Sequence, residues 1–154
     1  LEAVNEKRQK SPKPIYIKIA PDLADDDLKM ICELSKEMSF SGIIATNTTI
    51  QHDYGVGGVS GKFIKSIAKN MRDKACEILR EDPSQNIIGV GGIDSYSDIK
   101  NFWKKGGGLT QIYTSYIYHG PQILTQIQND ILADIEKYQF SNLQEMFQNI
   151  TKVD

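Results

Sequence analysis

Side chains that could bind a ligand follow four short apolar runs of this chain. Lys18 lies in the first run, the sequence Thr46-Asn47-Thr48-Thr49 follows the second, and Gly91-Gly92 and Tyr113-Thr114 follow the third and fourth. In (β/α)8 barrels the functional groups lie at the C-terminal ends of the strands and in the loops that follow. We therefore expect a cation, an amide, hydroxyl groups and glycine N–H groups to meet at one rim.

The glycine loops predict a phosphate site. Gly89–Gly92 and Tyr113–Ser115 follow the last two apolar runs, and the loops after barrel strands seven and eight are where these enzymes often bind phosphate. A glycine turn explains either loop alone, but it explains both together less readily. The Gly-Gly-Val-Ser-Gly sequence at 57–61 precedes a helix and allows close backbone approach to a ligand. We expect a branched side chain at Gly92 to occupy the space of the phosphate.

Lys18 and Asn47 each allow two interpretations. An ammonium inside an apolar strand costs several kcal/mol when unpaired, so Lys18 is predicted to be buried beside an anionic or strongly polar group. That group is either a bound ligand or a carboxylate on a neighbouring strand. The Asn47 amide carries donors and an acceptor that match the edge of a pyrimidine, but Asn also commonly caps turns at strand ends.

The pattern of apolar residues predicts which elements position these groups. Continuous apolar runs predict buried parallel strands at 15–19, 42–46, 86–90 and 109–113. Helical stripes are expected over 28–38, 63–79 and 123–135, after an N-cap at Ser95, and in a short terminal helix at 143–150. The fold class is α/β, with four βα units that form the C-terminal half of a (β/α)8 barrel over 15–154. Residues 1–14 are interpreted as a connecting segment, and a half barrel leaves sheet edges unpaired.

The Lys-Ile-Ala-Pro-Asp strand end at 18–22, the Thr-Asn-Thr-Thr run and the Tyr-Thr pair resemble the membrane-associated, quinone-using class of dihydroorotate dehydrogenase. The resemblance runs from about Pro14 to about Phe147 and covers the second half of that family's catalytic domain. It implies oxidation of dihydroorotate to orotate in de novo pyrimidine biosynthesis, with FMN as cofactor and quinone as electron acceptor. It implies substrate contacts for Asn47 and Thr48. The implied FMN contacts are Lys18, Thr46, Ser60, Gly61, Gly91, Gly92, Tyr113 and Thr114.

The same resemblance places other parts of the enzyme upstream of Leu1. The catalytic base is expected there, so no catalytic residue is assigned in this chain, and the upstream half of the barrel is an expected partner. Membrane association is expected only through that N-terminal region, at the mitochondrial inner membrane in a eukaryote or the cytoplasmic membrane in a bacterium.

Bulk properties exclude several other functions. A net charge of −2 and a pI near 5.7 give no electrostatic footprint for nucleic acid. No apolar run approaches the roughly 20 residues that span a bilayer. Cys32 and Cys76 lack metal-ligand spacing, so no metal site is predicted. Two alternatives remain open: another phosphate-binding barrel enzyme, and a non-catalytic half-barrel binding module.

Overall fold

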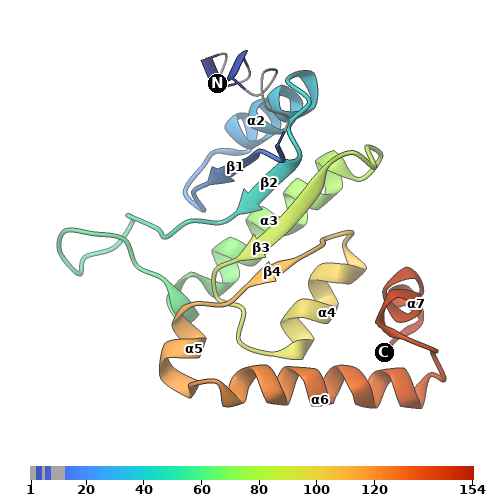
Figure 1. The fold of residues 1–154 in the computed structure, drawn as a ribbon. Coiled ribbons are helices and arrows are strands. Elements are labelled where there is room, and N and C mark those ends of the chain that lie inside the picture. Colours follow the sequence, from blue (N-terminus) through green and yellow to red (C-terminus); the bar gives the residue numbers. More distant parts are fainter. Residues whose placement is uncertain (1–2, 5, 8–12) are drawn as a thin grey trace.

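The computed structural model describes residues 3–4, 6–7 and 13–154, and most of the predicted connecting segment 1–14 lies outside them. Four parallel strands lie in the order β1-β2-β3-β4 (Figure 1). Their bounds are Tyr16–Ile19, Gly42–Ala45, Asn86–Val90 and Thr110–Gln111. Each strand leads into a helical segment, so the predicted half of a (β/α)8 barrel is confirmed.

The helices follow the strands in chain order. Helix α2 spans Asp25–Glu37, a 3-10 turn at Gly61–Ile64 leads into α3 at Lys65–Leu79, and α4 spans Tyr96–Lys104. After β4 come α5 at Thr114–His119, α6 at Gln122–Lys137, α7 at Leu143–Gln148 and a 3-10 turn at Ile150–Lys152. The short helix α5 was not predicted. None of the described helices combines the length and the apolar character that crossing a membrane requires.

The sheet has one covered face and one open face. Ile19, Ala45 and Gly89 are register partners on β1, β2 and β3, and all three are buried. Because successive side chains of a strand point to opposite faces, the register partners Lys18 and Ile44 belong to the other face. There Ile44 is half-buried and Lys18 is exposed.

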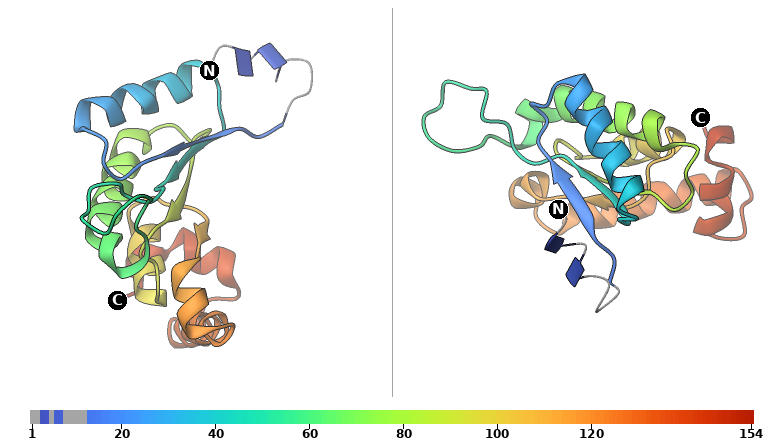
Figure 2. Two further views of the ribbon diagram at one scale, coloured as in Figure 1. Left: turned by 90° about the vertical axis from the view of Figure 1, so that its left-hand side faces the viewer. Right: turned by 90° about the horizontal axis from the view of Figure 1, so that it is seen from above.

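Helices α2 and α3 cover the buried face (Figure 2). The acidic first turn of α2, Asp25–Asp27, suits the positive end of the helix dipole, and Leu28 and Cys32 point into the core as predicted. The core cluster comprises Ile19, Leu28, Cys32, Ile43, Ala45, Met71, Ala75, Cys76, Leu79, Ile87 and Phe102. Phe63 and Ile67 were expected on the buried apolar stripe of 63–79, but both are exposed. Phe63 lies in the 3-10 turn, whose three-residue period shifts it off the buried face of α3.

A second core cluster joins α4 to α6. Helix α4 begins at the predicted cap, where the Ser95 hydroxyl oxygen accepts the N–H of Asp98 at 3.3 Å and the hydroxyl donates to the Asp98 carboxylate at 2.9 Å. Buried Tyr96 donates a hydrogen bond to Asp134 of α6 at 2.7 Å. The apolar members of the cluster are Ile93, Tyr96, Ile99, Ile123 and Ile127. This packing fixes the position of the chain that follows β4.

Candidate functional site

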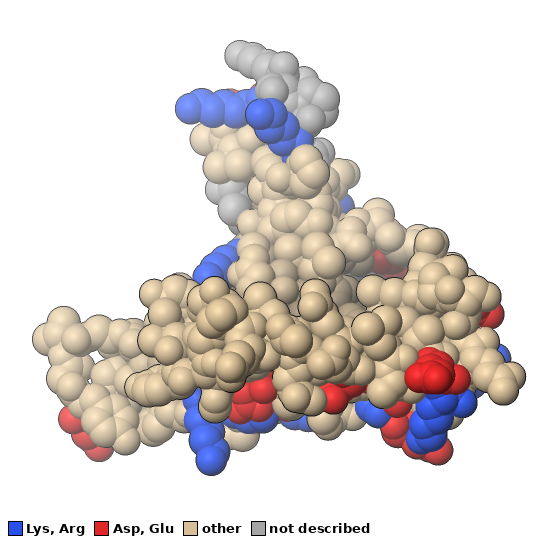
Figure 3. All heavy atoms as spheres, turned by 60° about the horizontal axis from the view of Figure 1, so that its bottom comes forward, with Lys and Arg blue, Asp and Glu red and all other residues tan. Residues whose placement is uncertain are grey.

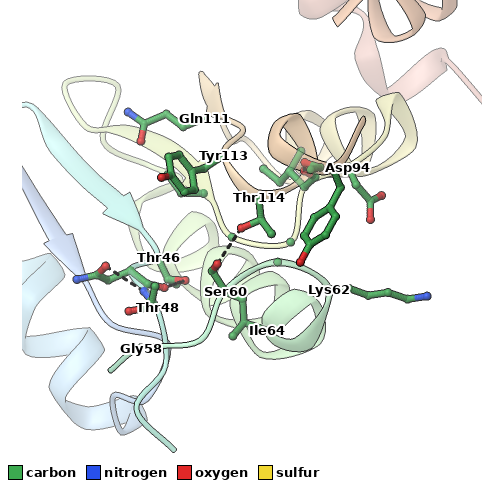
Figure 4. A pocket seen from close by; sticks show the side chains of 18 of the residues that line it. Thr46, Thr48, Gly58, Ser60, Lys62, Ile64, Asp94, Gln111, Tyr113 and Thr114 are labelled. Carbon is green, nitrogen blue, oxygen red and sulfur yellow. Dashed lines mark hydrogen bonds between the residues drawn. The ribbon is translucent and has the colours of Figure 1, made fainter. Parts of the chain in front are cut away.

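A cavity of about 660 Å³ lies at the C-terminal ends of all four strands (Figure 4). Its lining includes all ten residues that were singled out from the sequence. They are Lys18, Thr46, Asn47, Thr48, Ser60, Gly61, Gly91, Gly92, Tyr113 and Thr114. The structure therefore brings them to one place, while their division between cofactor and substrate stays a prediction.

Backbone hydrogen bonds tie the end of β2 to both neighbouring strands. The N–H of buried Thr46 donates to the Val90 carbonyl at 2.9 Å, and the N–H of Asn47 donates to the Ile19 carbonyl at 2.7 Å. The Asn47 side-chain oxygen accepts the N–H of Thr48 at 3.0 Å. Its amide NH2 group donates to no other described residue and remains available at the cavity. The turn interpretation and the ligand interpretation of Asn47 are thus compatible.

The connection after β2 makes a loop that returns to the cavity. Thr49 and Val59 form an antiparallel bridge, with N–H to carbonyl distances of 3.1 and 2.9 Å. The Asp22 carboxylate accepts the Thr49 hydroxyl and, at 3.0 Å, the N–H of Ile50. Residues 50–58 therefore project away from the sheet (Figure 1) while Ser60 is held at the rim. This gives the Asp of the Lys-Ile-Ala-Pro-Asp sequence a structural role that the sequence did not reveal.

A pair of hydroxyl groups joins the loop after β2 to the loop after β4. The Ser60 and Thr114 oxygens are 2.8 Å apart and point toward one another (Figure 4). A Cβ added at Gly61 would lie 2.7 Å from the Thr114 methyl carbon, so the two loops are in close contact there. Lys62, by contrast, extends away from this pair in Figure 4. The two loops thus form one wall of the cavity.

The glycine pair after β3 is packed against α3. Gly91 and Gly92 have φ of +96° and +67°, a region that favours glycine. A Cβ on Gly92 would lie 2.4 Å from the Lys65 Cα, which is backbone. The expectation that a side chain at Gly92 would occupy the phosphate space is therefore wrong about the direction in which that side chain points. Such a side chain meets the start of α3 instead.

Lys18 is exposed on the open face of the sheet, contrary to the prediction that it is buried. It lines the cavity, and no carboxylate among the described residues forms an ion pair with it. Within that part of the chain, the alternative of a structural ion pair with a neighbouring strand finds no support. The ammonium faces the cavity without a protein counterion there.

An ion-pair cluster of one lysine and two aspartates borders the cavity near Gly92. The Lys65 ammonium lies 2.7 Å from carboxylate oxygens of both Asp94 and Asp98. Burial acts to raise the pKa of Asp98, but hydrogen bonds from Lys65, the Asp94 N–H and Ser95 outweigh it and lower that pKa. Burial acts to lower the pKa of Lys65, and its bonds to the two aspartates raise it. Asp94 lines the cavity, and Lys65 offsets one of the two carboxylate charges, which reduces but does not remove repulsion of an anionic ligand.

Several lining residues were missed at the sequence level. Gln111 ends β4, Asp94 follows the glycine pair, and His119 ends the unpredicted helix α5. Gln111 and Asp94 lie within three residues of predicted site positions, so their place at the end of strand four and in the loop after strand three was an available signal. His119 had none, because its approach to the cavity depends on α5.

Comparison with known proteins identifies relatives of this chain. The family model for dihydroorotate dehydrogenase matches residues 1–135. A dihydroorotate dehydrogenase (quinone) from Vibrio parahaemolyticus is 40% identical over 126 residues, which are 77% of this chain and 37% of the relative. A mitochondrial dihydroorotate dehydrogenase (quinone) from Candida glabrata is 36% identical over 141 residues, a match that covers 84% of this chain and 32% of the relative.

Solved structures agree with the family match. The crystal structure of a dihydroorotate dehydrogenase from Eimeria tenella in complex with ferulenol superimposes with a TM-score of 0.74 at 28% identity, covering 86% of this chain and 37% of that one. The chain thus spans about a third of the length of each of these relatives.

Proposed function

This chain belongs to the dihydroorotate dehydrogenase family, and we propose from this premise that it supplies half of the active site of a quinone-dependent dihydroorotate dehydrogenase. The relatives named above carry the quinone designation. In the complete protein, the cavity at the strand ends would bind FMN and one side of the substrate. The reaction proposed for that protein is oxidation of dihydroorotate to orotate in pyrimidine biosynthesis.

One observation carries this proposal: a cation, an amide and a glycine cradle meet in one cavity. Lys18, Asn47 and Gly92 come from the ends of three different strands and line the same space. A barrel enzyme that binds only a phosphate has use for the glycines, but not for Lys18 together with the free donors of Asn47. A non-catalytic module has no need for Lys18 and the free donors of Asn47 to line one cavity together.

The described residues fit FMN. The Ser60–Thr114 hydroxyl pair and the N–H groups of Gly91 and Gly92 suit a phosphate, because small residues let the backbone approach the ligand and successive N–H groups form an anion site. FMN, when bound, supplies the hydride acceptor and passes electrons to quinone. Lys18 would stabilise negative charge at the ring, and Thr46 and Tyr113 would contact the cofactor beside it.

Asn47 and Thr48 would form the substrate clamp. The Asn47 oxygen is held by the N–H of Thr48, so the orientation of the free NH2 group is fixed before a ligand arrives. A pre-oriented amide loses little entropy on binding the carbonyl groups of a pyrimidine. The catalytic base is proposed to lie outside this chain.

The remainder of the site is proposed to come from the other half of the barrel. Residues 15–154 would form the C-terminal half, joined through residues 1–14. In the described part of the sheet, β1 and β4 are each paired on one side only. Apolar side chains near β4, α5 and α6 are exposed, including Leu109, Ile117 and Leu132. In Figure 3 the broad central surface carries few charged side chains, which gather along its lower border. Such a surface suits burial against another part of the protein.

The complete enzyme is proposed to act at a membrane. The mitochondrial designation belongs to the Candida glabrata relative. For the present protein we propose the mitochondrial inner membrane if its source is eukaryotic and the cytoplasmic membrane if it is bacterial. The contact with the membrane, and with quinone, would be made outside the described residues.

The test uses the complete purified protein. Dihydroorotate added without oxygen should bleach the visible absorbance of the bound flavin, and a soluble quinone should then restore it. Orotate formation should match the quinone consumed. A protein that carries flavin but is not bleached by dihydroorotate would contradict the proposed substrate. A protein without flavin would contradict the proposed cofactor.

A further inference from the structure

Arg72 is a buried cation directly behind the glycine pair. Its side chain points from α3 toward the end of β3 and is 3% exposed. Its Nη1 donates to the carbonyl oxygens of Val90 at 2.8 Å and Gly91 at 2.7 Å. No carboxylate among the described residues pairs with it, and its Nε has no hydrogen-bond partner there. Burial accordingly lowers the pKa of Arg72.

The two hydrogen bonds orient the N–H groups of the next residues. In a planar trans peptide the C=O and the following N–H point in opposite directions. Arg72 holds the Val90 and Gly91 carbonyls toward α3, so the N–H groups of Gly91 and Gly92 are directed away from it. Both glycines line the cavity, and neither N–H donates a hydrogen bond within the described part of the chain. They are therefore available to a ligand.

The guanidinium also adds positive charge at this position. A buried charge is screened much less than one in water, so its field reaches across the glycine loop. The face of Phe102, whose ring centroid lies 6.0 Å from the Arg72 Cζ, and the carboxylates of Asp73 and Asp98, which interact with Arg72 without forming an ion pair, compensate the cation only in part. An anion on the other side of the loop would complete the compensation.

We infer that Arg72 is a positioning residue for the phosphate of FMN, acting through the peptides that it holds and through its charge. This inference rests on the proposed function and extends it to a residue behind the cavity wall. Arg72 does not line the cavity, so it would act without touching the cofactor.

The test compares FMN with riboflavin, which lacks the phosphate, in the complete protein after removal of its cofactor. Dissociation constants are measured by flavin fluorescence in the wild type, Arg72→Met, Arg72→Lys and the control Arg80→Met, which replaces an exposed arginine of the same segment. Arg72→Met should weaken FMN binding at least about tenfold, and riboflavin binding less than about twofold. Arg72→Lys should recover most of the preference for FMN, and Arg80→Met should leave it unchanged.

Several results would overturn the inference. If Arg72→Met weakens both ligands equally, or keeps the preference for FMN, Arg72 only supports packing. Should Arg72→Met fail to fold, Arg72→Gln replaces it, since the amide keeps hydrogen-bond donors but loses the charge. Full FMN preference in folded Arg72→Gln would refute the charge contribution. A wild type that binds FMN no better than riboflavin would refute the phosphate site itself, and one that binds neither would refute the proposed cofactor.

Discussion

Gly92→Ala tests the arrangement of the glycine pair against α3. The added Cβ would lie 2.4 Å from the Lys65 Cα and 3.0 Å from the Lys65 N, both backbone atoms that cannot rotate away. Gly106→Ala is the matched control, because Gly106 also has a positive φ, of +95°, but its Cβ would meet nothing within 4 Å. Both variants carry the strain of a left-handed alanine, about 1–2 kcal/mol. Only Gly92→Ala adds overlap with backbone, which typically costs about 1–3 kcal/mol.

The difference between the two variants isolates the overlap, because the strain and the effect of alanine on the unfolded chain occur in both. We expect Gly92→Ala to be about 1–3 kcal/mol less stable than Gly106→Ala. Urea unfolding of the cofactor-free complete protein measures this as a shift in midpoint at unchanged slope. Gly92→Ala should also hold less FMN, because Gly92 lines the cavity. Equal stability of the two variants would refute the contact between Gly92 and α3.

Three further predictions concern charge, substrate and pH. Lys18→Ala should lower the flavin reduction potential by about 30 mV or more, equivalent to ~1.4 kcal/mol for two electrons. The control Lys62→Ala should leave the potential unchanged. An unchanged potential in Lys18→Ala would remove Lys18 from the flavin site. Asn47→Ala should weaken orotate binding about tenfold to a hundredfold at normal FMN content, as followed by titration of the flavin spectrum, and Asn101→Ala on the exposed side of α4 serves as the control. Burial raises the pKa of Cys76 from 9.0 to about 12. The Cys76 thiol of the unfolded chain therefore loses its proton at a lower pH than that of the folded chain, so its contribution to the free energy of unfolding is complete below about pH 9 and is lost above it. Urea midpoints should decline less steeply with pH in Cys76→Ala than in the wild type. Identical declines would contradict the burial of this thiol.

The fold was largely predictable because continuous apolar runs identify buried strands. The four runs fall within two residues of the observed strands, and Ser95 caps α4 as its sequence indicates. Helix α5 was missed because the six residues from Thr114 to His119 bury no side chain and so carry no apolar stripe.

The sequence predicted which residues line the cavity, but not how their side chains are arranged. The residues that line the cavity could be identified because they follow strands in the sequence. The direction of a Cβ at Gly92 could not, because its contact with the Lys65 backbone depends on how α3 packs. Lys18 was placed in the core because its neighbours Ile17 and Ile19 are apolar, but it points to the open face. Arg72 could have been found, since it lies four residues after Ala68 on the same buried face of α3, where a cation is unusual.

The central claim is that this chain holds half of a flavin site that the other half of the barrel completes. The direct measurement is the flavin content and dihydroorotate turnover of residues 1–154 purified alone and after co-expression with the upstream half. The account predicts little flavin and no turnover for 1–154 alone, and a yellow, active complex with near-stoichiometric FMN when both halves are present. Turnover by 1–154 alone, or a complex of both halves without flavin, would contradict it.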